Sequence, residues 1–253
     1  MLETILAIKQ QEIEKIFLPE EQSTTHYSLH DALKHSPYLA GLIAEVKKAS
    51  PSKGVIRDDF NPVVIAREYE KAGAQAISVL TDQHFFQGHR DFLSDIKKVV
   101  NLPVLRKDFI MDSIQIEESA RIGADAILLI GEALEPKQLH EFYQHAEGLG
   151  LEALVEVHSE ETLEGILKEF TPKIIGINNR NLKTFETTLE QTKKIAPMVP
   201  KESLIVSESG IFSYENIEQV SAAGAEGILV GEALMRQNDL NHAVTRLMGG
   251  VRS

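Results

Sequence analysis

The stretch Ile122-Gly-Ala-Asp-Ala-Ile-Leu-Leu-Ile130 decides the fold, because it joins the end of a helical pattern to a short strand pattern that is apolar on both faces. Its first half recurs as Ala72-Gly-Ala-Gln-Ala76 and Ala223-Gly-Ala-Glu-Gly227, with a looser copy at 148–151. The glycine of each copy fits the left-handed backbone conformation that ends many helices. Repeated junctions of this kind predict a chain built from strand–helix units.

Eight short apolar, β-branched runs support this reading, and helical patterns separate most of them. The runs are 42–44, 76–80, 104–105, 126–130, 153–155, 174–177, 204–206 and 227–230. The chain has 253 residues, and a closed barrel of eight such units typically takes about 250. The sequence therefore predicts an α/β protein with a single (β/α)₈ TIM barrel. The alternative is an open doubly wound sheet, whose first strand would be expected to lead into a glycine-rich nucleotide-binding loop. The first predicted strand of this chain is not followed by such a loop, which disfavours the alternative.

The chain shows no linker that would divide it, so we expect one domain over residues 1–253. Apolar positions at helical spacing over 2–17 predict a helix ahead of the barrel. We place this helical extension at 1–38 and the barrel at about 39–253. A helix in that position would pack on the body of the protein or cover a site.

Composition and charge exclude several classes of function. Apolar residues make up 43% of the chain and charged residues 25%, as in ordinary globular proteins, and no run is long enough to cross a membrane. A net charge of -12 disfavours nucleic acid as a partner. There is no Cys, and the His residues show no metal-ligand spacing, so we expect no metal. The start lacks a secretory signal pattern, which favours the cytoplasm.

Polar residues follow most of the apolar runs, at the point where each predicted strand ends. In a barrel these ends meet at one face, where enzymes of this fold carry their chemistry. Each residue alone has a structural explanation as a solvated charge or a helix cap. Together, two lysines, several carboxylates, an Asn and an Arg at one mouth indicate a ligand site. These residues are Glu45, Lys47, Lys107, Glu156, Asn178, Arg180, Glu208, Ser209, Gly231 and Glu232.

Two loops indicate that the ligand carries a phosphate. Ser207-Glu-Ser-Gly-Ile211 and Val230-Gly-Glu-Ala-Leu-Met235 follow the seventh and eighth runs, where barrels of this type bind phosphate. The lysine-rich loop 47–54 is a further anion-facing segment, and the aromatic pair Phe85-Phe86 is a candidate wall for a ring substrate.

Several of these segments resemble motifs of indole-3-glycerol phosphate synthases, and the matching motifs are spread over essentially the whole chain. The first-run motif Glu45-Val-Lys-Lys-Ala-Ser-Pro-Ser-Lys-Gly54 and the motif Ile177-Asn-Asn-Arg-Asn-Leu182 are specific in combination. Further matches are Phe85–Gly88, Pro103–Phe109, Glu156–His158, Ser207–Ile211 and Val230–Met235.

The resemblance implies a cofactor-free carboxy-lyase of tryptophan biosynthesis, which closes the ring of 1-(2-carboxyphenylamino)-1-deoxyribulose 5-phosphate with loss of CO₂ and water. It implies catalytic roles for Lys107, Glu156, Lys47, Glu45 and Asn178. It implies substrate contacts from Arg180, Glu208, Phe86, Phe109 and Leu128. It implies phosphate contacts from Ser50, Ser209, Gly210, Gly231 and Glu232.

The sequence leaves open the proton-transfer roles and the choice between this function and two alternatives. Which lysine and which glutamate acts in which proton transfer does not follow from the residues. An aldolase with Lys107 as a Schiff-base nucleophile and a non-catalytic barrel that binds a sugar phosphate are the alternative functions. We expect a monomer whose partner is a small phosphorylated substrate.

Overall fold

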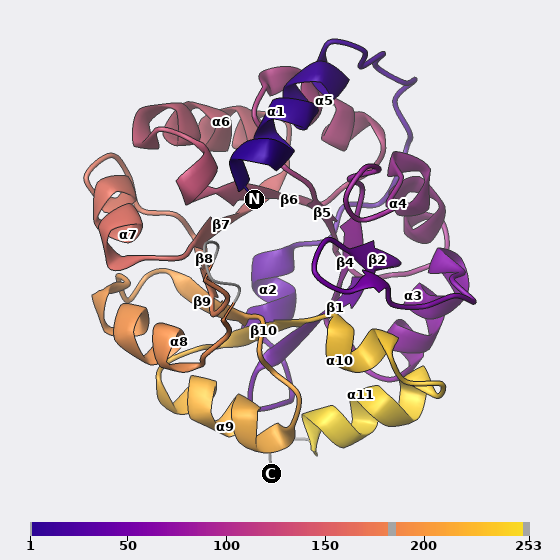
Figure 1. The fold of residues 1–253 in the computed structure, drawn as a ribbon, viewed down its shortest axis with the longest axis vertical. Coiled ribbons are helices and arrows are strands. Elements are labelled where there is room, and N and C mark those ends of the chain that lie inside the picture. Colours follow the sequence, from indigo (N-terminus) through magenta and orange to yellow (C-terminus); the bar gives the residue numbers. More distant parts are fainter. Residues whose placement is uncertain (1, 182–185, 250–253) are drawn as a thin grey trace.

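The computed structural model describes residues 2–181 and 186–249, and within them eight parallel strands close into a barrel (Figure 1). Leu182, the last residue of the second motif, lies outside the described residues. Neighbours pair in the order β1-β10-β9-β8-β7-β6-β5-β4, and β4 closes on β1. The barrel strands are β1 (Gly41–Val46), β4 (Ala76–Leu80), β5 (Val104–Lys107), β6 (Ala126–Ile130), β7 (Glu152–Val157), β8 (Ile174–Asn178), β9 (Leu204–Glu208) and β10 (Gly227–Val230). Each overlaps a predicted apolar run, and the predicted barrel is confirmed.

Helices surround the barrel, and local signals fix their ends. Asn61 and Ser159 cap the helices that follow them, and Asp112 forms a capping box with Gln115. Gly123 of the deciding stretch has φ 86°, the left-handed conformation that its position predicts. The outer helices are α3 (Pro62–Lys71), α4 (Arg90–Lys97), α5 (Ser113–Arg121), α6 (Pro136–Gly148), α7 (Glu160–Leu167), α8 (Glu190–Ile195), α9 (Tyr214–Ala222), α10 (Glu232–Met235) and α11 (Leu240–Met248).

The core has two layers, one between the sheet and the outer helices and one inside the barrel. A short helix, α2 (Leu29–Lys34), adds Leu29 and Leu33 to the inner layer. Glu152, at the start of β7, accepts hydrogen bonds from the backbone N–H groups of Leu29 and His30, at 2.5 and 3.0 Å. Because parallel strands all start at the same end of the barrel, α2 closes that end and leaves the opposite end for a site.

The N-terminal helix α1 (Leu2–Ile13) lies over the other end of the barrel, where Figure 1 shows its first residues directed toward the centre of the ring. It is shorter than the predicted helix over 2–17. The helix ends in a tighter turn after Ile13, whose carbonyl accepts a hydrogen bond from the N–H of Ile16, three residues on, at 3.0 Å. Phe17 follows with 82% of its surface exposed, so it does not extend the apolar face.

The loop after β1 also differs from expectation. Within the predicted loop 47–54, β2 (Ala49–Ser50) and β3 (Gly54–Val55) pair as a small antiparallel hairpin beside the barrel. In the part of the chain that the structure describes, no helix is long and apolar enough to cross a membrane.

Candidate active site

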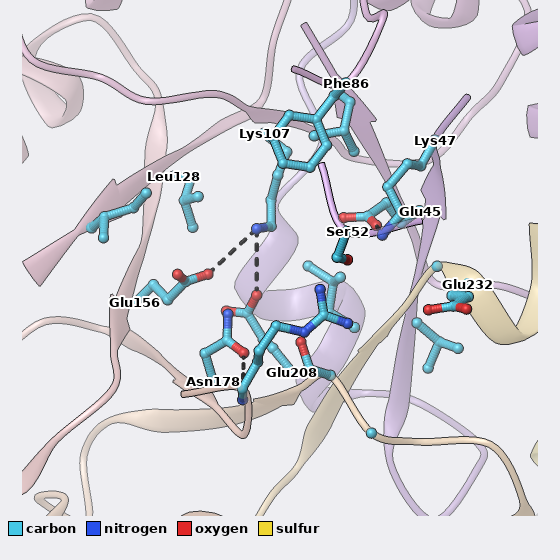
Figure 2. Close-up of a pocket in the computed structure, with 18 of the residues that line it drawn as sticks. Glu45, Lys47, Ser52, Phe86, Lys107, Leu128, Glu156, Asn178, Glu208 and Glu232 are labelled. Carbon is cyan, nitrogen blue, oxygen red and sulfur yellow. Dashed lines mark hydrogen bonds and ion pairs between the residues drawn. The ribbon is translucent and has the colours of Figure 1, made fainter. Parts of the chain in front are cut away.

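A pocket opens at the carboxyl ends of the barrel strands (Figure 2). All the site residues named from the sequence line it except Ser50. Those residues are Glu45, Lys47, Phe86, Lys107, Phe109, Leu128, Glu156, Asn178, Arg180, Glu208, Ser209, Gly210, Gly231 and Glu232.

Lys107 lies at the centre of the charged groups. Its Nζ is 3.4 Å from Glu156 Oε2 and 3.7 Å from Glu208 Oε2, and Figure 2 shows it directed between the two carboxyl groups. β5, β7 and β9 supply these three residues. Burial alone would lower the pKa of Lys107, but the carboxylates of Glu156 and Glu208 raise it above its usual value. The ammonium group is therefore held in its charged form.

The carboxyl groups of Glu156 and Glu208 both face the Lys107 ammonium, and each affects the ionisation of the other. Burial favours the neutral form of both. The nearby Lys107 ammonium nevertheless holds the pKa of Glu156 below its usual value. Burial and the Glu156 charge raise the pKa of Glu208 well above the usual value of a glutamate. The two shifts run in opposite directions, which favours the ionised form of Glu156 and the protonated form of Glu208.

A second acid–base pair comes from β1 and the residue that follows it. Lys47 Nζ forms an ion pair with Glu45 Oε1, on the opposite side of the pocket from Glu156 in Figure 2. Glu45 is 4% exposed. Burial opposes its ionisation, but Lys47 and Lys107 hold its pKa below the usual range.

The motif at the end of β8 contributes one polar side chain and one cation. Asn178 Oδ1 accepts a hydrogen bond from the Arg180 backbone N–H at 3.1 Å, which turns the chain directly after the strand. The two side chains line the pocket together. Asn179 points the other way, where its side-chain amide donates to Ser207 Oγ at 2.9 Å.

An apolar wall closes another side of the pocket. The rings of Phe86 and Phe109 pack with their centroids 6.2 Å apart, and Leu128 from β6 lies on the same lining. Leu2 and Ile5 of α1 line the pocket from above. The apolar spacing over 2–17 predicted a helix that packs on the body of the protein or covers a site. It did not show which residues of that helix would line a pocket.

The loops after β9 and β10 each bring a glycine to the pocket lining. Ser209 and Gly210 have φ values of 65° and 79°, so two consecutive residues adopt the left-handed conformation. At Gly231, a Cβ atom would collide with Glu45 Oε1 and lie 3.0 Å from Lys47 Nζ. Glycine at this position therefore lets the β10 loop lie directly against the Glu45–Lys47 pair.

Ser50 is the one named residue that the structure does not place on the pocket. It is buried in β2, where it pairs with Gly54 in the hairpin. Pro51 and Ser52 line the pocket instead, because the hairpin turns the loop just after Ser50. The hydroxyl of this loop that lies on the pocket lining is that of Ser52.

His158 and Asp108 line the pocket as well, although neither was singled out from the sequence. Both lie within quoted motifs, and His158 follows Glu156 at the same two-residue spacing as Asn178 and Arg180. That spacing, which places two side chains on one side of the chain, was the available signal. Among the described residues, no group of three or more acidic or His side chains is arranged to hold a metal ion.

Acid–base groups gathered at the carboxyl end of an eight-stranded barrel define the class of this protein as a TIM-barrel enzyme. The family model of indole-3-glycerol phosphate synthase matches residues 2–247, and the chain belongs to this family of carboxy-lyases. Among curated relatives, the indole-3-glycerol phosphate synthase of Priestia megaterium is 62% identical over 98% of both chains. That of a Geobacillus species is 61% identical over 100% of this chain and 98% of its own.

Solved structures that are distant in sequence share the fold alone. Thiamine phosphate pyrophosphorylase from Pyrococcus furiosus superposes with a TM-score of 0.62 at 19% identity, over 87% of this chain and 96% of its own. The fold match agrees with a TIM barrel and carries no argument about the reaction.

Proposed function

We propose that this chain converts 1-(2-carboxyphenylamino)-1-deoxyribulose 5-phosphate into indole-3-glycerol phosphate, CO₂ and water. Family membership supports the reaction class, and the observation that carries the proposal is Lys107. Its buried ammonium lies 3.4 Å from one carboxyl group and 3.7 Å from another, within one pocket. The reaction needs such groups because it moves protons in at least two steps.

Lys107 is the proposed acid for ring closure. In that step the aromatic carbon that bears the carboxylate attacks the ketone carbon of the sugar, and the ketone oxygen takes up a proton. The raised pKa of Lys107 keeps it protonated until a stronger base develops beside it, as an alkoxide does. CO₂ then leaves from the ring carbon that made the attack, and the electron pair of the broken bond restores the aromatic ring.

The dehydration step needs both an acid and a base. The hydroxyl formed from the ketone leaves as water after it takes up a proton, and the neighbouring carbon loses one. Glu156 is the proposed base, because its lowered pKa keeps it ionised beside protonated Glu208. The Glu45–Lys47 pair lies across the same pocket and is the proposed source of the acid, with Lys47 as the donor.

The remaining lining residues fit the two ends of this substrate. We assign the anthranilate ring to the wall of Phe86, Phe109 and Leu128, which is apolar and rigidly packed. We assign the phosphate to the open region between the loops after β9 and β10, where backbone N–H groups and Ser209 are accessible. Ser50 stays the proposed phosphate contact from the first loop, and its neighbour Ser52 offers a second hydroxyl on the pocket lining. Arg180 is the proposed partner of the substrate carboxylate.

The Schiff-base aldolase is disfavoured by the same lysine. A lysine that attacks a carbonyl must lose its proton, and enzymes achieve this by lowering its pKa. Here the carboxylates of Glu156 and Glu208 raise the pKa of Lys107. An ammonium in this setting is a proton donor and a poor nucleophile.

Turnover with the proposed substrate tests the function. The chain has no Trp, so indole fluorescence from the product will appear against a low background. We expect fluorescence to rise with enzyme concentration, and no substrate-dependent adduct on Lys107 after borohydride treatment. A borohydride-stable adduct on Lys107 without indole formation would establish the aldolase instead.

We further propose that the chain works as a monomer of 28.1 kDa in the cytoplasm. The pocket is lined by residues of a single chain, which supports an active monomer. Light scattering during size-exclusion chromatography measures the mass directly.

A further inference from the structure

Glu156 is approached from two sides by nitrogen atoms, and the mechanism above uses only one of them. Lys107 Nζ faces Glu156 Oε2, while His158 Nε2 lies 3.5 Å from Glu156 Oε1. The His158 side chain is 7% exposed and lines the pocket. Its Nε2 makes no hydrogen bond within the described residues, so Glu156 is the polar group it faces.

Glu132 fixes the imidazole ring in this direction. It lies in the 3₁₀ turn Gly131–Ala133, which follows β6. One carboxylate oxygen accepts the His158 backbone N–H at 2.8 Å, and the other lies 2.9 Å from His158 Nδ1. On the far side, the Gln191 side-chain amide donates to the His158 carbonyl at 2.6 Å. Both the backbone and the ring of His158 are therefore held in place.

The charge of His158 acts on one member of a pair of carboxyl groups whose pKa values are shifted in opposite directions. Burial lowers the pKa of His158, but the bond to Glu132 and the charge of Glu156 raise it above its usual value. A protonated His158 stabilises negative charge on Glu156, its ion-pair partner at 3.5 Å. The groups that face Glu156 are Lys107, His158, Glu208 and Asn178. Of the two cations, Lys107 pairs with both Glu156 and Glu208, whereas the ion pairs of His158 within the described residues are with Glu156 and Glu132.

We propose that His158, held by Glu132, is a positioning residue that fixes the Glu156 carboxylate in the orientation in which it accepts a proton from the substrate. This inference rests on the proposed role of Glu156 as a base. It assigns the Glu132–His158 pair the task of deciding which carboxyl group is ready to accept a proton from the substrate. Without His158, Lys107 alone favours neither partner strongly, since its distances to them are 3.4 and 3.7 Å.

His158→Gln tests the proposal, because it keeps a side-chain N–H and removes the positive charge. We expect kcat to fall about 10-fold near pH 6, because the Glu156 carboxylate loses the charge that holds it in place, and a misplaced catalytic group can cost up to ~10²-fold. The deficit will shrink toward alkaline pH, where wild-type His158 loses its own charge. KM will change little, because the proposal gives His158 no contact with substrate.

Glu132→Gln is the second test, and it removes the charge that supports protonated His158 while it preserves the shape of the side chain. It will show the same pH-dependent deficit with a smaller amplitude. His30→Gln is the matched control, since His30 pairs with Asp31 at 3.3 Å and is absent from the pocket lining.

The pH dependence separates the outcomes. A deficit that is the same at every pH, or no deficit in either variant, overturns the proposal. If one variant does not fold, the profile of the other decides. A wild-type protein that forms no indole product would instead refute the proposed function itself, so the two failures are distinguishable.

Discussion

Lys107 and Glu156 show how position, rather than residue type, creates a reactive group. A lysine that ends a strand is ordinarily a solvated charge, and a glutamate there is ordinarily a cap or an ion-pair partner. Here β5 and β7 bring the two within 3.4 Å in a buried pocket, which shifts the pKa of each toward its charged form. The sequence placed both at the barrel mouth, but the distance depends on the closed register of the sheet.

Replacing either group removes a proton-transfer partner, so Lys107→Met and Glu156→Gln will each lower kcat by about 10²-fold or more. Fluorescence of the indole product measures the rate. Lys201→Met, on an exposed turn before β9, is the control and will leave kcat unchanged. A variant of Lys107 with a near-normal rate would remove that residue from the mechanism.

At the scale of elements, α1 is tied to the pocket by one buried lysine. Lys9 Nζ lies 2.8 Å from Asp82 Oδ2 and 2.9 Å from Asp108 Oδ1. These two carboxylates also accept the backbone N–H groups of Phe86, at 3.2 Å, and Phe109, at 2.8 Å. Through this lysine the covering helix and the aromatic wall are held by the same carboxylates. The apolar spacing of α1 predicted a packed helix but gave no sign of the polar contact.

Lys9→Met will therefore reduce both stability and substrate binding. It leaves two buried carboxylates without their shared cation, and breaking a buried pair in this way costs about 3–5 kcal/mol. Urea denaturation measures the free energy of unfolding, and we expect KM to rise in the same variant. Lys98→Met, which breaks the exposed Lys98–Asp95 pair, will cost about 1 kcal/mol or less. An equal loss in the two variants would contradict the assigned role of Lys9.

The β10 loop makes a second prediction at this scale. In Gly231→Ala the new methyl group collides with Glu45 and crowds Lys47, so that pair must shift. Misplacement of catalytic groups by about 1 Å can cost about 10²-fold, and we expect kcat/KM to fall by 10- to 100-fold. Gly148→Ala is the matched control, because nothing lies within 4 Å of its added Cβ. Equal activity in the two variants would show that the close approach at Gly231 has no catalytic role.

For the whole molecule, apolar periodicity and the polar residues at strand ends were enough to predict the barrel and most of its pocket. Features that depend on local turns and on contacts distant in sequence were not predicted. The barrel and most pocket residues follow from strand runs that end in polar side chains. Ser50 is the one predicted site residue outside the pocket lining, because the hairpin β2–β3 turns its loop, and two-residue strands leave no periodic pattern. His158 was missed because its significance comes from Glu132, which lies 26 positions away in sequence.

The free energy of unfolding will also depend on the buried carboxyl pair of Glu156 and Glu208. The raised pKa of Glu208 means that its stabilising contribution is complete below its unfolded pKa, about 4.3, and is lost as pH rises through its folded pKa. Glu208→Gln stays neutral, so it will be more stable than wild type at pH values above that range and will lose this advantage in acid. Urea denaturation at several pH values measures the difference. A difference that does not grow with pH would contradict the assigned protonation of Glu208.

The most direct test of the account follows both products from a substrate labelled with ¹³C in its carboxylate. We predict one ¹³CO₂ for each indole-3-glycerol phosphate, with both rates lowered together in Lys107→Met, because one pocket carries out ring closure and all that follows. Release of ¹³CO₂ without indole, or an undiminished rate of both in Lys107→Met, would contradict it.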